Sequence, residues 1–539
     1  MKKLTYLGLF FSFIGLLGLL TLDSRLSARQ SLNLTSPDGT PLFATYYPGS
    51  VPNGVLLLEG FGSDQYMMRA LVHDLTASGL HVFTFDYSGH GASPGALEYD
   101  NASTGRLAGQ VQAAMTEFQR ISGLDSSQIV WMGHSLGARV ALQSSVLGPV
   151  SPAKLVLLGA QINLGTNAQS EFFTGTTDSG LGWVQSLGPD NPRTPILLVT
   201  GTWDDILTVD AAQSLMTKLC GKKTTSCDEG TIREWVLFDM LVHNYEVYSP
   251  RVISAGRAWA FPDMDHPSSY AMLRIVLWLS TIAGIFLVLI GFKGSVGNNA
   301  SNIDQGITIT DPRKLVLGKL WLWLIALPLS GVIMFLYVLI PLPSPTFNLI
   351  YGGFLGGYGL LMYLLYYFGK MPGALGRLRN ISLQKPPMPK GWLWAALFNV
   401  GLFVTVALLY RSGIGLVPPV GARFLWVLIF VPLTTLGFWV GMLEADALAV
   451  AVPGKSIYRI LSLLISLFPF YLYLILLVFL GSISGVIGSL TGLMVLAVSI
   501  LQGEITRILT GNSLVSAIVQ SLLVFCLILP SGALFTPFF

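Results

Sequence analysis

The chain has 539 residues, of which 52% are hydrophobic and only 11% are charged. Soluble globular domains carry about 25% charged residues, so the composition excludes a chain that is soluble throughout. The formal net charge of +3 and the lack of a basic stripe give no basis for a nucleic-acid partner. The charge deficit lies mainly after about residue 268, whereas residues 30–265 have the composition of a soluble domain.

The N-terminus carries two lysines and then an uncharged apolar run from Leu4 to Leu22. A run of about 20 apolar residues is long enough to span a bilayer as a helix. A cleaved signal peptide is the alternative, although no small-x-small cleavage site follows the run. We predict that residues 1–29 are a transmembrane anchor or an uncleaved signal, and either interpretation exports the segment that follows.

Residues 30–265 are predicted to form one α/β domain. Short apolar runs alternate with helical patterns, which indicates a mainly parallel sheet covered on both faces. The first segment contains Pro37-Asp38-Gly39 and is predicted to be a hairpin at an antiparallel edge. The predicted strands are 54–60, 81–87, 128–134, 154–160, 195–201 and 234–240, and the predicted helices lie near 65–78, 101–121, 136–147 and 208–219.

A Gly-x-Ser-x-Gly motif is centred on Ser135, with Gly133 and Gly137 on either side. The motif alone is weak evidence, because the chain contains 58 glycines. Its context is more specific: an apolar run precedes it and helical spacing follows, as the strand–turn–helix of a nucleophilic serine requires. A serine hydroxyl also needs a base that takes its proton, and histidine is the natural choice.

Residues 31–262 resemble the α/β-hydrolase superfamily, especially its monoacylglycerol lipase and serine aminopeptidase-like branch. The resemblance is carried by the elements EGFGSD, FDYSGHGAS, GHSLG, GTWDD and VHNYEVYSPRV, which occur in the order that this fold requires. It covers less than half of the chain. It implies an α/β-hydrolase fold and a Ser-His-Asp triad that works through an acyl-enzyme.

The resemblance assigns the catalytic roles to particular residues. Ser135 is expected to be the nucleophile, and His243, after the last predicted strand, is expected to be the base. The acid must lie between them in chain order, and Asp204 fits because the family pattern Gly-x-x-Asp starts here at Gly201. The neighbouring Asp205 is the alternative acid, and a helix cap or a surface charge is its structural interpretation.

The oxyanion that develops during acyl transfer needs preorganised hydrogen-bond donors. The resemblance implies that these are the backbone N–H groups of Leu136 and Phe61. The chain departs from the family at this loop, since it has Glu59-Gly60 where relatives usually carry His-Gly. We expect Glu59 to brace the loop, and binding of a cationic group is the alternative.

Residues 161–194 form an insertion between two predicted strands, at the position where such folds carry a lid. The aromatic residues Phe172, Phe173 and Trp183 are expected to line an apolar acyl pocket. The alternative is that they pack the lid onto the body of the domain. Both interpretations are compatible with the sequence.

Two of the three cysteines, Cys220 and Cys227, flank a short polar loop in the domain that is predicted to be exported. Oxidising compartments permit disulfides, so we predict that these two cysteines are paired. Two free thiols are the alternative. The sequence contains no cofactor-binding or metal-binding motif, and we expect neither group.

Residues 266–539 are predicted to form a membrane domain of about eight transmembrane helices. Lysine and arginine residues concentrate in alternate connections of this domain, whereas the other short loops hold only Arg411 and Arg423. The positive-inside rule then places the α/β domain and the C-terminus outside the cytoplasm. The expected spans are 269–292, 315–341, 346–369, 391–410, 424–443, 460–480, 483–503 and 511–530.

Three acidic residues, Glu444, Asp446 and Glu504, lie near the predicted cytoplasmic ends of these spans. Carboxylates inside a membrane are expensive, so each is a candidate for function. The alternative is that they lie in the interface and are hydrated.

The sequence therefore predicts a bacterial-type serine hydrolase that is embedded in the cell membrane and has an extracytoplasmic catalytic domain. The expected substrate is a small-molecule or lipid-like carboxylic ester, whose acyl group is hydrolysed or transferred next to the lipid bilayer. One alternative is a serine peptidase of the same fold. Another is a transporter or membrane scaffold with a non-catalytic hydrolase-like domain.

Overall fold

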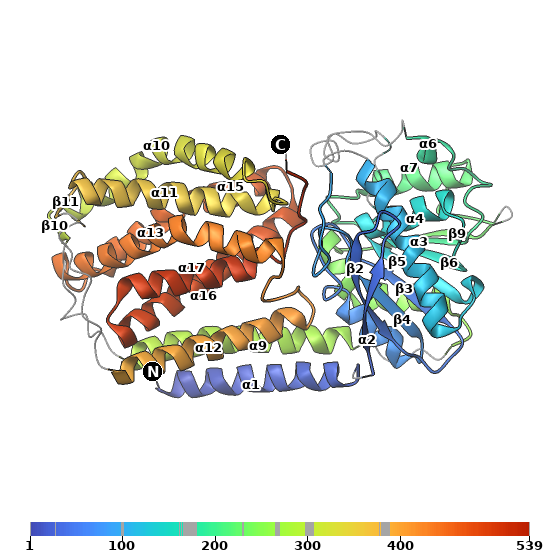
Figure 1. Cartoon of the computed structure of the whole chain (residues 1–539), viewed down its shortest axis with the longest axis horizontal. Coiled ribbons are helices and arrows are strands. Elements are labelled where there is room, and N and C mark those ends of the chain that lie inside the picture. Colours follow the sequence, from blue (N-terminus) through green and yellow to red (C-terminus); the bar gives the residue numbers. More distant parts are fainter. Residues whose placement is uncertain are drawn as a thin grey trace.

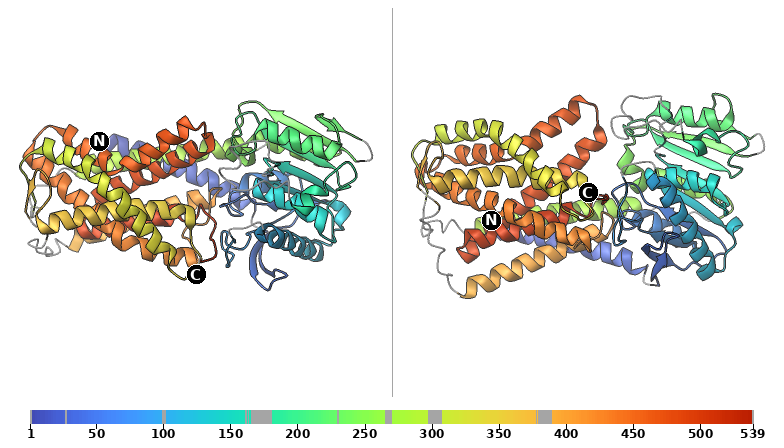
Figure 2. Two further views of the ribbon diagram at one scale, coloured as in Figure 1. Left: turned by 90° about the horizontal axis from the view of Figure 1, so that it is seen from above. Right: turned by 45° about the horizontal axis from the view of Figure 1, so that its top comes forward.

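The structure is a computed structural model, which describes residues 2–26, 28–98, 102–160, 162, 164, 181–228, 231–264, 270–296, 307–376, 378 and 389–537. An α/β unit lies at one end of a bundle of long helices, and the two parts together are elongated (Figures 1 and 2). The helices of the bundle point their ends toward the α/β unit, so their end turns and the loops between them contact it.

The α/β unit is built on a nine-stranded sheet with the order β1-β2-β4-β3-β5-β6-β7-β9-β8. The central strands pair in parallel, and β1 and β2 form the predicted antiparallel hairpin at one edge. All six strands expected from the apolar runs are present. The strands are β1 (Gln30–Thr35), β2 (Pro41–Tyr47), β3 (Gly54–Leu58), β4 (His81–Phe85), β5 (Ile129–His134), β6 (Lys154–Leu158), β7 (Ile196–Gly201), β8 (Ser226–Cys227) and β9 (Arg233–Phe238).

Helices cover both faces of this sheet. One face packs against α3 (Ala102–Ser122), α4 (Leu136–Leu147) and α7 (Val209–Cys220), and the other packs against α2 (Arg69–Ala77) and α8 (Pro250–Ala260). The strands are buried on both sides, which explains why their sequences are continuous apolar runs instead of alternating patterns. The short helix α6 (Gly182–Gln185) lies above α4.

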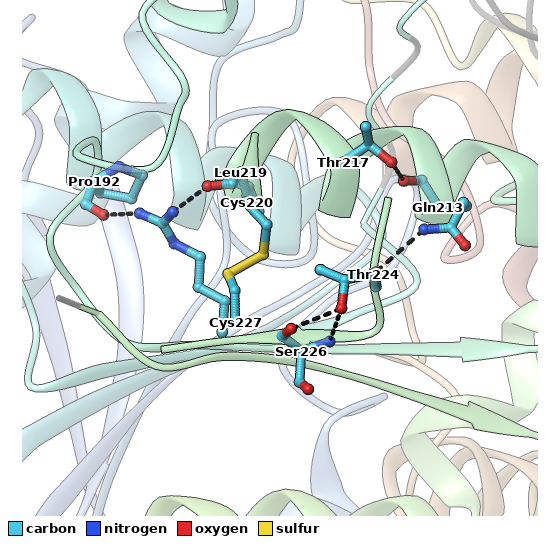
Figure 3. Close-up of a disulfide and its surroundings, with 9 residues drawn as sticks. Pro192, Gln213, Thr217, Leu219, Cys220, Thr224, Ser226 and Cys227 are labelled. Atoms are coloured by element: carbon cyan, nitrogen blue, oxygen red, sulfur yellow. Dashed lines mark hydrogen bonds between the residues drawn. A yellow bond between two sulfur atoms is a disulfide. The ribbon is translucent and has the colours of Figure 1, made fainter. Parts of the chain in front are cut away.

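A disulfide joins Cys220 at the end of α7 to Cys227 in β8, with an S–S distance of 2.02 Å (Figure 3). The predicted pairing is therefore confirmed. Arg233 pairs with Cys227 across the β8–β9 ladder, and its guanidinium donates hydrogen bonds to the backbone carbonyls of Leu219 and Pro192. These bonds fix the edge of the sheet that is farthest from the β1–β2 hairpin.

The bundle holds seven helices that are long and apolar enough to cross a membrane, or eight if a bent pair counts as one span. This count covers the described residues and includes α1; the shorter apolar helix α17 is additional. A described helix corresponds to each of the eight predicted spans. The helices are α1 (Lys2–Ser24), α9 (Ala271–Val296), α10 (Pro312–Val338), α11 (Leu349–Phe368), α12 (Pro389–Arg411), α13 (Ala422–Ala451), α14 (Ser456–Ser466), α15 (Phe468–Phe479), α16 (Ile483–Thr510) and α17 (Ser513–Ile528).

The predicted span at 460–480 is not one continuous helix. This segment forms two helices, α14 and α15, which meet at Leu467 with a bend of 68°. Pro469 lies in the first turn of α15, and a proline has no N–H with which to continue the hydrogen bonds of α14. The apolar composition does not reveal this break, because the residues on both sides of it are apolar.

Helix α1 packs along α9 within the bundle (Figure 1). Small residues permit this close approach, since a Cβ atom added at Gly8 would lie 2.5 Å from the backbone nitrogen of Val288. Small residues at such contacts are typical of helices that associate in membranes. At the end of the pair nearest the α/β unit, Arg274 of α9 forms an ion pair of 2.8 Å with Asp23 of α1.

The carboxyl edge of the sheet is docked on the loops at one end of the bundle. The loop after β3 contributes Asp64, whose carboxylate accepts a hydrogen bond of 2.7 Å from Leu416 N–H. The loop after β4 contributes the carbonyls of Gly89 and Gly91, to which Arg423 donates. Arg423 is 2% exposed, so this guanidinium depends on these contacts for its hydrogen bonds.

Three buried carboxyl groups, Glu59, Asp64 and Asp86, lie around Arg423 at this junction. Burial is the main reason that the pKa of each is raised, and their mutual repulsion adds to the effect on Glu59 and Asp64. The pKa is about 7 for Asp64 and about 6 for Asp86. The junction therefore binds protons in the folded state at a pH where an unfolded chain has released them.

This difference predicts a pH-dependent stability. Because the folded-state pKa values lie above the ordinary value of 3.8, the contribution of these groups to the free energy of unfolding falls as the pH rises through about 6 to 7. The melting temperature of the full chain should decrease between about pH 5.5 and pH 8. The decrease should be smaller in Asp64→Asn, which keeps an oxygen acceptor for Leu416; an equal decrease in both proteins would contradict the prediction.

Candidate active site

Ser135 occupies the turn between β5 and α4, with backbone angles of φ 53° and ψ −116°. A non-glycine residue pays for a positive φ, and such strain persists only where the surroundings enforce it. Here the backbone N–H of Ser135 donates to the carbonyl of Leu158 at 2.8 Å. A Cβ atom on Gly133 would lie 2.5 Å from the carbonyl carbon of Gly137, so the strand and the helix approach too closely for a larger residue.

His243 and Asp204 form a buried hydrogen-bonded pair. Nδ1 of His243 lies 2.8 Å from Oδ2 of Asp204, and the other carboxylate oxygen accepts the N–H groups of Ile206 and Leu207 at 2.9 and 2.7 Å. A carboxylate that faces Nδ1 favours the tautomer with the proton on Nδ1. The lone pair of Nε2 is then available, and Nε2 makes no hydrogen bond to any described residue.

The chain brings Ser135 and His243 to the same turn after β6. The backbone N–H of Ser135 donates a hydrogen bond to the carbonyl of Leu158, and Gly159, which follows Leu158, has a φ of 50°. A Cβ atom at Gly159 would lie 2.8 Å from both Cε1 and Nδ1 of the His243 ring. The three residues predicted for the triad therefore lie at one edge of the sheet.

Two further residues border this pair and were not assigned a role from the sequence. His134 packs its ring 4.8 Å from that of His243 and places Nε2 3.1 Å from the His243 carbonyl. Glu246, one turn after His243, is fully buried and lies 3.7 Å from His134 Nε2. In the sequence, the position of Glu246 three residues after His243 is the only sign that these two side chains lie close together.

The protonation of both residues follows from their burial. Burial, and then the neighbouring His243, lowers the pKa of His134 to about 3, so His134 is neutral. Burial, and then the charge of Asp204, raises the pKa of Glu246 well above its ordinary value. A protonated Glu246 adds no second negative charge beside Asp204.

His134, His243 and Glu246 are close enough in space to be considered as metal ligands. Two of the ring nitrogens have other partners. Nε2 of His134 faces the His243 carbonyl, so this nitrogen carries the proton, and Nδ1 of His243 faces Asp204. These contacts join His134 and His243 to the buried carboxylate of Asp204.

The two residues whose N–H groups are expected in the oxyanion hole, Leu136 and Phe61, both lie near Ser135. Leu136 is the first residue of α4, where backbone N–H groups have no partner inside the helix. Phe61 follows Gly60, and a Cβ atom at Gly60 would lie 3.4 Å from Cβ of Ser135. Neither N–H donates to another described residue.

The loop that carries Phe61 is braced from both sides. The carboxylate of Glu59 accepts the N–H of Tyr87 at 3.0 Å, which agrees with the bracing role expected for it. Gly62 N–H donates to Nε2 of His90 at 3.1 Å. Burial lowers the pKa of His90 to about 3, with a further effect from Arg423, so this ring stays neutral and accepts.

Asp205 points away from His243 and into the bundle. Its carboxylate accepts hydrogen bonds from the Ser482 hydroxyl at 2.8 Å and from the backbone N–H of Ser484 at 3.1 Å. Ser482 is the N-cap of α16, and a helix N-terminus attracts negative charge. Asp205 therefore acts as a helix cap, as the structural interpretation of the sequence suggested. The helix that it caps is α16 of the bundle.

The aromatic residues expected to line the acyl pocket have different positions. Trp183 is buried in α6, packs in the core of the α/β unit and has its ring 5.9 Å from the Arg139 guanidinium, which favours the packing interpretation. Phe172 and Phe173 lie outside the described residues. Phe61 itself carries an aromatic side chain at the predicted oxyanion hole. Its ring centroid lies 5.6 Å from that of Phe347 and 5.9 Å from that of Phe535, both of which belong to the bundle.

Comparisons with known proteins match only part of the chain. Residues 50–190 match the family model described as "Serine aminopeptidase, S33". An uncharacterized protein of Mycobacterium tuberculosis strain H37Rv is 36% identical over 139 residues, which are 25% of this chain and 47% of that protein. The chain thus spans about half the length of the curated relatives that it matches.

Similar solved structures include two esterases. An esterase from Pyrococcus furiosus is 17% identical over 47% of this chain and 94% of its own, with a TM-score of 0.32. A carboxyl esterase from Bacillus coagulans is 16% identical over 40% of this chain and 90% of its own, with a TM-score of 0.31. Values at this level carry no information about activity.

The expected fold and the expected family branch are both found in the α/β unit. The sheet has the predicted parallel core with an antiparallel edge, and the family match covers the serine turn. The chain therefore contains a domain with the α/β-hydrolase fold, of which residues 50–190 match the S33 serine aminopeptidase model, joined to a bundle of long apolar helices.

Proposed function

We propose that the protein is a membrane-embedded serine hydrolase that cleaves or transfers acyl groups through an acyl-enzyme on Ser135. The observation that carries the proposal is the 2.8 Å hydrogen bond between His243 Nδ1 and Asp204. It leaves Nε2 of His243 without a partner among the described residues, in the turn region that also holds the strained Ser135. This is the arrangement that a base needs in order to take a proton from a serine.

The reaction follows from these positions. Ser135 Oγ attacks the carbonyl carbon of the substrate while His243 Nε2 takes its proton. Asp204 stabilises the imidazolium that forms, and the N–H groups of Leu136 and Phe61 stabilise the negative oxygen of the tetrahedral intermediate. His243 returns the proton to the leaving group. Water, or another acceptor hydroxyl, then attacks the acyl-enzyme by the same steps.

The docking of the α/β unit supports a lipid-like ester as the substrate. The loops that carry Phe61, Asp204 and Asp205 lie at the carboxyl edge of the sheet, and this edge contacts the end of the bundle. The side chain of Phe61 packs against Phe347 and Phe535 from that end. An ester that is dissolved in the bilayer surface therefore has a shorter path to Ser135 than one that arrives from bulk water on the far side of the sheet.

The arrangement of charges supports an extracytoplasmic position for this domain. The cations of the connections lie at the end of the bundle remote from the α/β unit, as the contacts of Lys293 with Glu504 and of Arg313 with Tyr458 indicate. The positive-inside rule assigns such an end to the cytoplasm. The disulfide between Cys220 and Cys227 favours an oxidising compartment for the other end.

A serine-directed probe tests the nucleophile. A fluorophosphonate should label the full chain at Ser135, and Ser135→Ala should abolish the labelling because it removes the nucleophilic hydroxyl. His243→Ala should slow labelling by at least about a hundredfold, since general-base catalysis contributes on this scale. In-gel fluorescence and peptide mapping measure both effects, and equal labelling of Ser135→Ala would refute the assignment.

The adjacent carboxylates Asp204 and Asp205 form a matched pair of variants. Asp204→Asn should reduce kcat on a soluble ester by about four orders of magnitude, because it removes the group that orients His243. Asp205→Asn should leave most of the turnover and instead lower the melting temperature, because it weakens the contact with α16. If Asp205→Asn caused the larger loss of kcat, the acid would be wrongly assigned.

Reporter fusions test the orientation. A reporter that fluoresces only in the cytoplasm should be bright after Lys390, which follows α11 on the predicted cytoplasmic side, and dark after Phe539. Fluorescence after both positions would mean that the number of spans between them is even. Fluorescence after Phe539 alone would invert the topology and place the hydrolase domain in the cytoplasm.

A further inference from the structure

A cavity of about 340 Å³ lies in the bundle, among α9, α10, α11, α13, α14, α16 and α17. Its lining includes Lys319 and Glu504, which lie near the ends of their helices that are remote from the α/β unit. The cavity is therefore separate from Ser135. Its volume is within the range of small-molecule sites, about 300–1,000 Å³.

The two ends of the cavity differ in polarity. Lys293, Arg459 and Glu504 line the end that is remote from the α/β unit. Leu355, Phe438 and Ile500 line the part that reaches toward the middle of the bundle. Ile500 and Glu504 are one helical turn apart on α16, so the change from apolar to charged occurs over about 6 Å.

The charged end has an excess of positive charge. Lys319 is satisfied, because Glu444 at 2.6 Å and Ser462 at 2.7 Å both accept from it. Lys293 and Arg507 both form ion pairs with Glu504, with nitrogen-to-oxygen distances of 3.3 Å and 3.5 Å respectively. Arg459 forms no hydrogen bond and no ion pair within 4.0 Å with any described residue, and the four cations Lys293, Lys319, Arg459 and Arg507 face the three carboxyl groups Glu444, Asp446 and Glu504.

A second polar group lines the wall. The side chain of Tyr358 lines the cavity and is only 6% exposed, and its hydroxyl lies beside the side chain of Ser466. Its ring is held in place by stacking on Trp323, with centroids 4.3 Å apart. The donors left for a ligand are therefore those of Arg459, which have no partner among the described residues.

We propose that this cavity binds an anionic amphiphile, with its carboxylate or phosphate beside Arg459 and Lys293 and its acyl chain along the apolar wall. An inorganic anion would satisfy the cations and leave the apolar wall in contact with water. A neutral hydrocarbon would fill the wall and leave the cations uncompensated. A fatty acid and an anionic phospholipid share the required chemistry, and binding of either one is independent of the reaction proposed at Ser135.

Gly441 provides a direct test, because it lines the cavity and a Cβ atom added there would meet nothing within 4 Å. Gly441→Leu therefore places a side chain in the cavity from a position where its Cβ atom has free space. Gly401→Leu is the matched control: Gly401 lies on α12, does not line the cavity and also has no atom within 4 Å of an added Cβ. Both variants introduce the same side chain into an exposed position of a membrane helix.

The full chain in phosphatidylcholine nanodiscs is titrated with oleate, with a phosphatidylglycerol, with inorganic phosphate and with the neutral oleyl alcohol. Oleate or phosphatidylglycerol, or both, should bind to the wild type and to Gly401→Leu at least about tenfold more tightly than to Gly441→Leu, a difference of about 1.4 kcal/mol. Oleyl alcohol and inorganic phosphate should bind at least about tenfold more weakly than the preferred anionic lipid. The lipid that binds identifies the source of the head group.

Equal affinity of Gly441→Leu and Gly401→Leu for both anionic lipids would overturn the proposal, as would binding of oleyl alcohol as tightly as the anions, or a lack of any binding. If Gly441→Leu does not fold, Arg459→Gln keeps the cavity open and removes one cation. The preference for the anionic lipid over oleyl alcohol should then fall at least about tenfold. An unchanged preference would equally overturn the proposal.

Discussion

The burial of Arg423 between the α/β unit and the bundle is the contact on which the rest of the arrangement depends. Its guanidinium donates to carbonyls of Gly89 and Gly91 in the α/β unit and to Gly532 after the last helix. A buried guanidinium without such partners costs several kcal/mol. The two parts therefore hold one relative position, with the carboxyl edge of the sheet against the bundle.

This position ties the catalytic loops to the bundle. Asp204 and Asp205 are neighbours in sequence, but one binds His243 and the other binds the first turn of α16. The loop with Phe61 is likewise fixed by Phe347 and Phe535. The geometry on which the proposed chemistry depends is thus supported partly by side chains from outside the hydrolase fold.

The bundle has two chemically distinct ends. At the end against the α/β unit, polar groups of the bundle form hydrogen bonds with that unit; for example, Leu416 N–H donates to Asp64. The other end satisfies its charges within the bundle, through pairs such as Lys319 with Glu444 and Arg507 with Asp446. The acidic residues singled out in the sequence are therefore paired inside the protein instead of being hydrated at the interface. Of the cations that line the cavity, Lys293 and Lys319 are paired with these carboxylates and Arg459 has no partner among the described residues.

The sequence determined those features that depend on local patterns. The apolar runs predicted the strands and the helical spans, the elements from EGFGSD to VHNYEVYSPRV predicted the fold, and the cysteine spacing predicted the pair Cys220–Cys227. Strand and helix propensity depend on residues that are close in the chain, so these features can be predicted without a structure. The bend at Leu467 was missed because it interrupts a run that is apolar on both sides.

Only the tertiary structure decided which distant residues meet. In the structure, Asp205 accepts a hydrogen bond from Ser482, which is 277 positions away, and Asp64 accepts one from Leu416, which is 352 positions away. The tertiary structure also buried Glu246 beside Asp204 and left Trp183 in the core instead of in a pocket. A carboxylate carries no local sign of the partner that it will find, because that partner is fixed by the packing of whole elements and not by the neighbouring residues.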